Sequence, residues 1–429
     1  MFFEYTGKGV NLSGNTDKYL QYKIEYDKIT VCKYGVCCQK SFLQRFSHFE
    51  LILESLYMKQ PILLSTPTMH TEEQCYIREA FEKNWIAPLG FNCDSFEEEV
   101  CRYLGQPLHG VSLVSGTAAL HLALKLAGVK RGDIVLCSDL TFAATVNAVL
   151  YEGGIPVFVD SERDTWNMDP VALEKAFERY PQAKAVMLVQ LYGTPAKMDD
   201  ILAICRAHGA VLIEDAAEAL SATYRGQQCG TFGDYNVLSF NGNKIITTSG
   251  GGMLVTKDKA ARDKAFFWAT QSRENEYWYE HKEVGYNYRL SNVCAGIGRG
   301  QLLHIEEHKA AKKAIYERYK AGLADLPVQM NPYADGDEPN FWLSCITIDP
   351  SCAVDPISVL ETLREENIES RPLWKPMHLQ PVFAQYDMVY TEEAAVSADL
   401  FRRGLCLPSD IKMSASEQQR VIDCIKSCF

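Results

Sequence analysis

The sequence lacks the features of a membrane-spanning or exported protein. No uninterrupted apolar run approaches about 18 residues, the length that a membrane-spanning helix needs. The N-terminus, Met1-Phe2-Phe3-Glu4-Tyr5, has no basic region followed by an apolar one and does not predict a signal peptide. We therefore expect a cytoplasmic protein that does not enter a membrane.

The sequence also lacks an excess of positive charge and the usual cysteine motifs. A formal net charge of −12 argues against a nucleic-acid-binding surface. The 15 cysteines form no Cys-x-x-Cys pair, and Cys137, Cys205 and Cys345 stand inside apolar runs, as small buried side chains do in a reducing compartment. The cysteines between positions 32 and 38 have no neighbouring ligands, so the sequence predicts no metal site.

Short apolar segments alternate with helical ones in the central part of the chain. With 429 residues, 47% hydrophobic and 23% charged, the chain is long enough for two or three globular domains. Apolar strands are predicted over 110–114, 134–137, 156–159, 185–189 and 211–213, and helices over 117–127, 142–151, 169–180 and 198–208. Apolar strands separated by helices are typical of a mostly parallel sheet in an α/β domain. No Gly-x-Gly-x-x-Gly follows the first of these strands, which argues against a nicotinamide dehydrogenase.

The two ends of the chain differ from this central part. Residues 1–62 carry no motif, although 20–26 alternates like a strand and 46–57 reads as a helix. Towards the C-terminus we expect a long polar helix over about 300–323, a strand over 340–348, a helix opened by Asp355-Pro356 and a last helix with a capping box, Ser414 to Glu417. The predicted organisation is an N-terminal extension of unknown role (1–62), a large α/β domain (63–310) and a smaller C-terminal α+β domain (311–429).

Polar or aromatic residues follow four of these strands and one further short apolar strand, 237–238. Ligands of open α/β sheets bind outside the carboxyl ends of the strands, so we expect these residues to meet at one edge. They are Ser115-Gly116-Thr117, Thr141-Phe142, Gln190, Glu214-Asp215 and Ser239.

Three of these positions suggest a ligand with a phosphate and a flat ring. Ser115-Gly116-Thr117 opens a helix, whose free N–H groups favour an anion such as phosphate, although plain helix capping explains it equally well. Asp215 would hold a pyridinium nitrogen protonated, or cap a helix. Phe142 would stack on a flat ring, or belong to the core.

Lys244 follows an apolar strand, a hydroxyl and a turn, in the stretch 237–244. A lysine in such a turn can lose its hydration, which lowers the pKa of its amine and suits it to Schiff-base chemistry. The alternative is an exposed loop lysine.

Five motifs in this order resemble the DegT/StrS family of sugar-nucleotide aminotransferases. The similarity runs from about Leu63 to the end, and its motifs are Ser115–Leu120, Thr141–Thr145, Glu214–Glu218, Ser239-Phe240 with Lys244, and Gly285–Arg289. The resemblance implies a fold type I enzyme that uses pyridoxal 5'-phosphate. It says nothing about residues 1–62.

The resemblance also implies roles for single residues. Lys244 matches the Schiff-base lysine and Asp215 the partner of the pyridine nitrogen. Asn287 matches an asparagine that reaches the phosphate from the other subunit, which implies a homodimer with shared active sites. The remaining cofactor-binding positions are Gly116, Thr117 and Ser239 at the phosphate, Phe142 on the ring and Glu218 near the 3-oxygen, where a glutamate donates a hydrogen bond only when protonated.

A reaction follows from this resemblance. Glutamate would give its amino group to the cofactor, which passes it to a nucleotide-linked ketosugar, with Lys244 as the base that moves the proton. Dehydratases of the family carry histidine in place of this lysine, so Lys244 argues against dehydration. Other lysine-cofactor chemistry on the same fold and a non-catalytic regulatory protein remain alternatives.

Further stretches resemble the branch that aminates C4 of a UDP-4-keto-6-deoxy-N-acetylhexosamine, a step towards bacillosamine-type sugars. These are 65–70, 84–90, the insert 241–243 and 371–378. Arg371, Lys375 and His378 would bind a diphosphate there, or form a solvated loop. Trp85 and Trp374 would pack on sugar or uracil, and Gln190 would touch cofactor or sugar.

Overall fold

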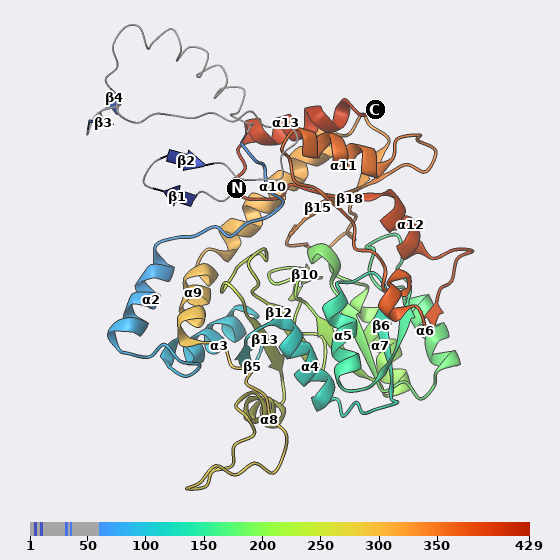
Figure 1. The fold of residues 1–429 in the computed structure, drawn as a ribbon. Coiled ribbons are helices and arrows are strands. Elements are labelled where there is room, and N and C mark those ends of the chain that lie inside the picture. Colours follow the sequence, from blue (N-terminus) through green and yellow to red (C-terminus); the bar gives the residue numbers. More distant parts are fainter. Residues whose placement is uncertain (1–3, 7–8, 12–30, 33–34, 37–59) are drawn as a thin grey trace. The chain divides into compact units, whose positions relative to one another are not determined.

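The computed structural model describes residues 4–6, 9–11, 31–32, 35–36 and 60–429 (Figure 1). The chain divides into two compact units, Met1–Gln60 and Pro61–Phe429. In the first unit, two antiparallel pairs are described: β1 (Glu4–Thr6) with β2 (Gly9–Asn11), and β3 (Val31–Cys32) with β4 (Gly35–Val36). The strand expected over 20–26 and the helix expected over 46–57 lie outside the described residues.

The second unit is organised around an eight-stranded sheet of order β17-β7-β6-β8-β9-β12-β13-β5 (Figure 1). Every strand of this sheet except β13 runs in the same direction, which confirms the mostly parallel α/β fold. In chain order the strands are β5 (His109–Leu113), β6 (Ile134–Ser138), β7 (Ile155–Val159), β8 (Ala185–Val189), β9 (Val211–Asp215), β12 (Tyr235–Ser239), β13 (Gly252–Thr256) and β17 (Met388–Val389).

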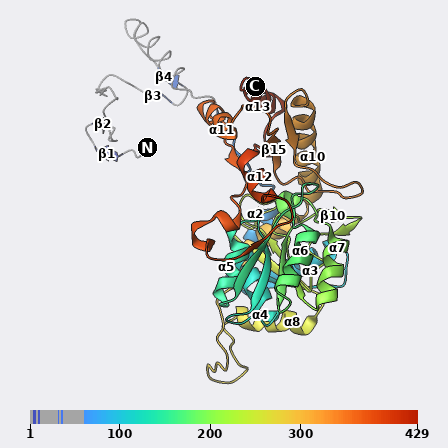
Figure 2. The same cartoon turned by 90° about the vertical axis from the view of Figure 1, so that its right-hand side faces the viewer.

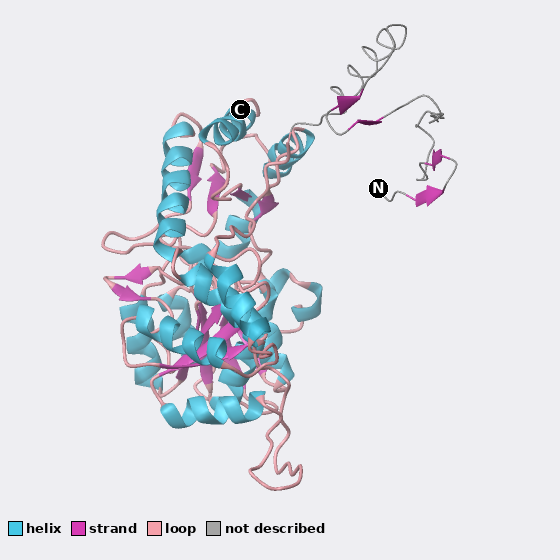
Figure 3. Cartoon of the chain, turned by 90° about the vertical axis from the view of Figure 1, so that its left-hand side faces the viewer, coloured by secondary structure: helices cyan, strands magenta, loops and turns pink. Residues whose placement is uncertain are grey.

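Helices cover both faces of this sheet (Figure 3). Successive residues of β6 show why the strands of this sheet are apolar throughout. Val135 and Cys137 pack in the core on one face, while Leu136 packs in the core on the other, as the period of two requires. The first face carries α4 (Gly116–Leu126), α5 (Ala143–Tyr151) and α8 (Lys259–Ala269), and the second carries α3 (Phe91–Tyr103), α6 (Pro170–Arg179) and α7 (Met198–His208).

Several expected helix ends are confirmed in detail. The Asp169 and Asp355 side chains accept the N–H groups of the second helical residues of α6 and α11 (Pro356–Glu365), each of which starts with proline. The capping box of α13 (Ala415–Lys426) forms between Ser414 and Glu417. These signals act locally, so the sequence alone was sufficient to place them.

The long helix expected over 300–323 was wrong in its boundaries. The structure has two helices here, α9 (Asn292–Leu302) and α10 (Ile305–Gly322). Helix α9 contains three glycines at alternate positions, which made its sequence look non-helical. They allow both α2 (Glu72–Glu82) and α3 to pack closely against α9: a Cβ on Gly300 would lie 2.6 Å from the backbone nitrogen of Glu73 in α2, and a Cβ on Gly298 would lie 2.6 Å from the ring of Phe96 in α3.

The C-terminal third forms a second, four-stranded sheet of order β14-β15-β18-β16. Its strands are β14 (Val328–Met330), β15 (Ser344–Ile348), β18 (Gly404–Leu407) and β16 (Arg371–Pro372), and α10, α11 and α13 share its core. The expected strand 340–348 therefore begins four residues later, at Ser344. Strand β17 comes from the same third of the chain but joins the large sheet beside β7, so residues 311–429 contribute to both sheets. The division of the chain at residue 310 remains a prediction.

Short elements complete the described part of the chain. They are η2 (Leu191–Gly193), β10 (Thr223–Tyr224), β11 (Gln227–Gln228), η3 (Met377–Leu379), η4 (Pro381–Phe383) and α12 (Val396–Arg403). Figures 1 and 2 also show that the segment between α8 and α9 projects away from the sheet, and Tyr277 in this segment is fully exposed.

Two expectations from composition can be compared with the described residues. Cys137, Cys205 and Cys345 are buried and form no disulfide, as the apolar runs predicted. Within residues 60–429 and the short described stretches before them, no helix has the length and apolar character needed to cross a bilayer.

Candidate active site

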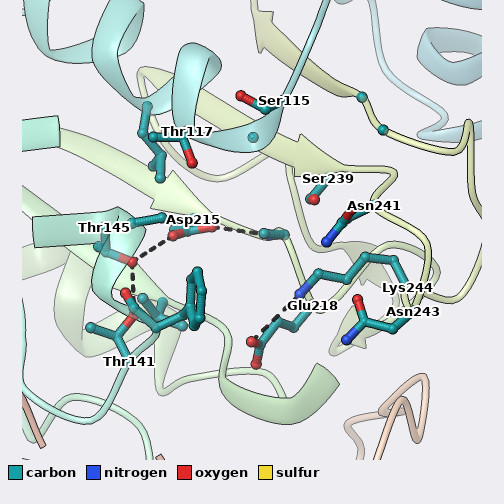
Figure 4. A pocket seen from close by; sticks show the side chains of 18 of the residues that line it. Ser115, Thr117, Thr141, Thr145, Asp215, Glu218, Ser239, Asn241, Asn243 and Lys244 are labelled. Atoms are coloured by element: carbon teal, nitrogen blue, oxygen red, sulfur yellow. Dashed lines mark hydrogen bonds and ion pairs between the residues drawn. The ribbon is translucent and has the colours of Figure 1, made fainter. Parts of the chain in front are cut away.

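A cavity of about 270 Å³ lies at the carboxyl ends of β5, β6, β9 and β12 (Figure 4). This is the edge at which the sequence predicted a ligand site. Eight of the predicted site residues line it: Gly116, Thr117, Phe142, Asp215, Glu218, Ser239, Lys244 and Trp374.

The amine of Lys244 points into this cavity from the turn that follows β12 (Figure 4). Its Nζ atom lies 3.6 Å from Glu218 Oε1 and 3.9 Å from the centroid of the Trp342 ring. Burial lowers the pKa of the Lys244 amine, while the carboxylates of Glu218 and Asp215 oppose that shift. An amine with a lowered pKa is the nucleophilic form that Schiff-base chemistry requires, as the sequence predicted.

Asp215 lies across the cavity from Lys244 at the end of β9. The Thr145 hydroxyl donates to Asp215 Oδ2 (2.8 Å), and the Ala217 N–H donates to Oδ1 (3.1 Å). Thr145 is itself 2.7 Å from the Thr141 hydroxyl. Burial raises the pKa of Asp215, so a cationic ring nitrogen beside it would favour the ionised carboxylate.

The start of α4 and the end of β12 form one side of the cavity. Ser115 caps the helix, since its hydroxyl accepts the Ala118 N–H, and Gly116 and Thr117 begin it. A Cβ on Gly116 would lie 3.2 Å from the Cβ of Ser239, so this close approach favours glycine. Helix N–H groups and two hydroxyls at one point make a suitable site for a phosphate.

Aromatic side chains form the opposite walls. Phe142 lines the cavity although 57% of it is exposed, and its ring centroid lies 5.4 Å from that of Trp374. Trp342 is fully buried beside Lys244. A flat ligand ring therefore has an apolar face to pack on.

Glu218 is fixed by a strained loop. Its Oε2 accepts the N–H of Tyr192 (2.7 Å), a residue with a left-handed backbone (φ 51°) in η2. The Tyr192 hydroxyl accepts the N–H of Trp374 (2.8 Å). Burial raises the pKa of Glu218, while the nearby Lys244 amine opposes that shift.

The structure does not place Gln190 in the cavity. Its side chain is fully buried: Nε2 donates to Glu214 Oε1 (2.8 Å), and Oε1 accepts the N–H of Ala196 (2.7 Å). Glu214 and Asp215 are consecutive in a strand and point to opposite sides, so Glu214 joins Gln190 while Asp215 faces the cavity. Its Nε2 also contacts the sulfur of Met198 (3.3 Å), so all partners of the buried Gln190 amide come from this chain.

The basic segment 371–378 contributes Trp374 to the cavity, but its charged side chains lie elsewhere. Arg371 is exposed and pairs with Glu369 (2.8 Å). His378 Nδ1 contacts Asp139 Oδ2 (2.7 Å), and Lys375 is exposed. These side chains do not line the cavity, and two of them already have acidic partners within the chain.

Trp85 and Asn287 also lie outside the cavity lining. Trp85 is exposed, and its carbonyl accepts a hydrogen bond from Asn292. Asn287 is exposed at the end of the projecting segment and forms an isolated antiparallel bridge with Thr270. Within a single chain, Asn287 does not reach the site.

One spacing typical of metal sites was overlooked in the sequence. His304 and His308 are four residues apart, and His70 stacks on His304 with ring centroids 3.6 Å apart. His70 Nε2 also lies 2.9 Å from His308 Nε2. Throughout the described residues, no group of three or more histidine, cysteine or acidic side chains is arranged to hold a metal ion.

Sequence reasoning missed two further residues at the site. Thr145 lies in the first turn of α5, four residues after Thr141, and this spacing could have indicated that both face the strand ends. Trp342 gave no such signal, because it sits in an apolar run that was assigned to a strand of the smaller domain. The path of the chain before β15 brings it to Lys244.

These residues fit pyridoxal 5'-phosphate. The cavity has a buried amine for its aldehyde, a buried carboxylate for its ring nitrogen and a helix N-terminus with hydroxyls for its phosphate. Asp215 has one hydrogen-bond donor from the chain on each oxygen and faces the cavity, which leaves room for a third.

The comparisons with known proteins agree with this chemistry. The profile of the DegT/DnrJ/EryC1/StrS aminotransferase family matches residues 67–426. EpsN of Bacillus subtilis (strain 168), whose name describes a pyridoxal phosphate-dependent aminotransferase, is 49% identical over 379 residues, which cover 87% of this chain and 97% of EpsN. GDP-perosamine synthase of Caulobacter vibrioides (strain ATCC 19089 / CIP 103742 / CB 15) is 36% identical over 365 residues, which cover 84% of this chain and 96% of that protein.

A solved structure shares the fold. DesI, solved in the presence of its TDP-sugar product, superposes with a TM-score of 0.78 at 27% identity, covering 86% of this chain and 93% of DesI. Together with the family match, this confirms the fold type I architecture and the pyridoxal phosphate cofactor that the sequence motifs predicted. The chain belongs to the DegT/DnrJ/EryC1/StrS family and is a pyridoxal phosphate-dependent aminotransferase.

Proposed function

We propose that this enzyme transfers an amino group from glutamate to the C4 carbonyl of a nucleotide-linked ketosugar. The substrate in this proposal is UDP-2-acetamido-2,6-dideoxy-4-keto-hexose, and the product is a 4-aminosugar for a surface glycan or glycoprotein. The sugar class is supported by relatives, since two of the similar proteins are named for a GDP-linked sugar and a TDP-linked sugar product. The UDP-linked C4 substrate rests on the sequence stretches 65–70, 84–90, 241–243 and 371–378.

One observation carries the proposal: the Lys244 amine and the Asp215 carboxylate face the same cavity, beside the start of α4. Bound pyridoxal phosphate supplies an electron-accepting ring that stabilises negative charge on the carbon being deprotonated. Asp215 holds the ring nitrogen protonated. Gly116, Thr117 and Ser239 hold the phosphate, and Phe142 packs on the ring.

Lys244 has two tasks in this proposal. Its amine first holds the cofactor covalently, and burial keeps this amine nucleophilic. Once the amino donor replaces it, the free amine takes the proton from the donor's α-carbon and later returns a proton to the sugar's C4. Glu218, 3.6 Å away, stabilises the protonated amine between these transfers.

A second copy of the chain completes the site in this proposal, because Asn287 is exposed and outside the cavity. The side chains of Val114 and Phe142 line the cavity while 42% and 57% exposed, which leaves apolar surface at its mouth for a partner. We therefore propose a homodimer in which Asn287 of each subunit reaches the phosphate in the other.

The test of the reaction is a screen of 3-ketosugars and 4-ketosugars carrying UDP, GDP or dTDP, with glutamate as donor. Mass spectrometry follows formation of the aminosugar. The proposal predicts turnover with the UDP-linked N-acetyl 4-ketosugar, at a kcat/KM above that of the other nucleotides. A preference for another nucleotide or for a 3-ketosugar would overturn the substrate assignment and leave the aminotransferase intact.

The shared site has a separate test. Lys244→Ala and Asn287→Ala are each inactive in this proposal, but a mixed dimer contains one complete site. Mixing the two variants under conditions of subunit exchange should restore about one quarter of wild-type turnover. No recovery, despite exchange shown by native mass spectrometry, would contradict the contribution from the partner.

A further inference from the structure

Trp342 forms a wall of the cavity next to the Lys244 amine. Its side chain is 1% exposed, and its ring centroid lies 3.9 Å from Lys244 Nζ. Glu218 lies on another side of the same amine, 3.6 Å away. The amine is therefore held between an acidic side chain and an aromatic face.

Three hydrogen bonds fix Trp342 in this position. The indole N–H donates to the carbonyl of Asn243 (2.6 Å), the residue before Lys244. The Trp342 backbone N–H donates to Asn340 Oδ1 (2.9 Å), and its carbonyl accepts from the buried Lys312 amine (3.0 Å). Both the ring plane and the backbone are thus tied to neighbouring segments.

Asn340 also connects Trp342 to the other side of the amine. Its side-chain amide donates to the carbonyl of Glu218 (2.8 Å) and to that of Leu220 (2.9 Å). A Cβ on Gly193 would lie 1.7 Å from Asn340 Oδ1, so glycine is needed for this close packing. One buried asparagine therefore sets the spacing between Trp342 and Glu218.

We propose that Trp342 is a positioning residue for Lys244. Its ring face holds the free amine in line with the cavity, and its indole N–H fixes the turn that carries the lysine. The role matters when the amine is free, so it rests on the proposed function in which Lys244 is released and acts as a base.

The ring face has a predictable electrostatic effect. An aromatic face attracts the charged ammonium and not the neutral amine, so Trp342 raises the pKa of Lys244 and opposes the effect of burial. Among the described residues that line the cavity, Asp215 and Glu218 are the other titratable groups, and both act in the same direction. Replacing the ring by an aliphatic side chain should therefore make the amine lose its proton at a lower pH.

The experiment measures the protonation of Lys244 in the full-length protein freed of cofactor. Trace acetic anhydride acylates unprotonated amines, and peptide mass spectrometry gives the labelling of Lys244 as a function of pH. The exposed Lys130 serves as the internal reference. The variants are Trp342→Leu, which removes the aromatic face, Trp342→Phe, which keeps a face and removes the N–H, and Phe341→Leu, which removes the neighbouring buried ring.

Trp342→Leu should lower the labelling midpoint of Lys244 by about one pH unit. Trp342→Phe should keep the midpoint close to that of wild type but weaken binding of pyridoxal phosphate about five-fold, because Asn243 loses its donor. Phe341→Leu should leave the midpoint unchanged. An unchanged midpoint in Trp342→Leu, or an equal shift in Phe341→Leu, would overturn the proposal.

A second measurement avoids any loss of packing. Replacing the six tryptophans by 5-fluorotryptophan weakens the negative face of the ring with little change in size. The midpoint should fall in the wild-type background and stay constant in Trp342→Phe, and a fall in both would contradict the assignment to Trp342. Neither measurement uses a sugar or an amino donor, so failure of the substrate assignment would leave these results interpretable.

Discussion

The strand ends and the basic segment 371–378 were both predicted to bind ligand, and the structure treats them differently. At the strand ends, Gly116, Thr117, Asp215 and Ser239 all line one cavity. In the basic segment, Trp374 lines it and the charged side chains do not. The positions of the strand-end residues follow from the order and direction of the strands in the sheet. The basic segment is a loop, so the contacts of its side chains do not follow from the sheet topology.

This contrast shows what a charge cluster in a sequence can mean. Asp139 is fully buried, and it receives the backbone N–H of His378 (2.9 Å), His378 Nδ1 (2.7 Å) and the Ser397 hydroxyl (2.6 Å). His378 therefore anchors the segment to the large sheet. Two of the three basic residues that suggested a diphosphate site, Arg371 and His378, contact acidic side chains of the same chain instead.

The largest expected effect is at the strand end itself. Asp215→Asn should lower kcat about 10²–10³-fold, because the amide cannot hold the ring nitrogen protonated. Thr145→Val keeps the carboxylate and removes its 2.8 Å donor, so it should cost about ten-fold or less. Steady-state rates at saturating cofactor measure both. Equal losses in the two variants would contradict the direct role of Asp215.

Removing the contact between His378 and Asp139, which anchors the basic segment, should lower the stability of the protein. His378→Ala leaves the buried Asp139 carboxylate with fewer partners and should lower the free energy of unfolding by about 1–3 kcal/mol. Urea denaturation measures it. Arg179→Ala removes an ion pair whose two side chains are each 55% exposed, and should change stability by less than about 1 kcal/mol. A His378→Ala protein as stable as wild type would show that this contact is not an anchor.

The smallest expected effects are changes in the KM for the sugar, which distinguish Trp374 from the charged side chains of the same segment. Trp374→Ala removes an apolar wall of the cavity and should raise the KM for the sugar about ten-fold. Arg371→Ala should change this KM less than about three-fold, because the side chain is exposed and paired with Glu369. A large KM increase in Arg371→Ala would restore the diphosphate role that the sequence suggested.

The sequence predicted those parts of the site that depend on local pattern and sheet topology. Apolar strands, helix caps and the polar residues at the strand ends placed Asp215, Ser239 and Lys244 at one edge, and the cavity is there. The helix predicted over 300–323 corresponds to α10, whereas most of α9 was missed, because its three glycines serve tight packing against α2 and α3.

Residues brought to the site by long-range packing were harder to predict. Trp342 reaches Lys244 because its backbone is held by Asn340 and Lys312, and no local pattern encodes these contacts. Gln190 was expected at the ligand because it follows a strand, but its amide is used by Glu214 and Ala196. A position at the end of a strand places a residue at the ligand-binding edge of the sheet. Whether its side chain faces the cavity depends on the hydrogen-bond partners that surround it.

The covalent attachment of the cofactor tests the central claim most directly. Borohydride reduction of the protein loaded with pyridoxal phosphate, followed by peptide mass spectrometry, identifies the lysine that holds it. We expect the pyridoxyl group on Lys244, and loss of both the visible absorption band and the adduct in Lys244→Ala but not in Lys130→Ala. An adduct on another lysine, such as the buried Lys312, or an unchanged band in Lys244→Ala would contradict the account.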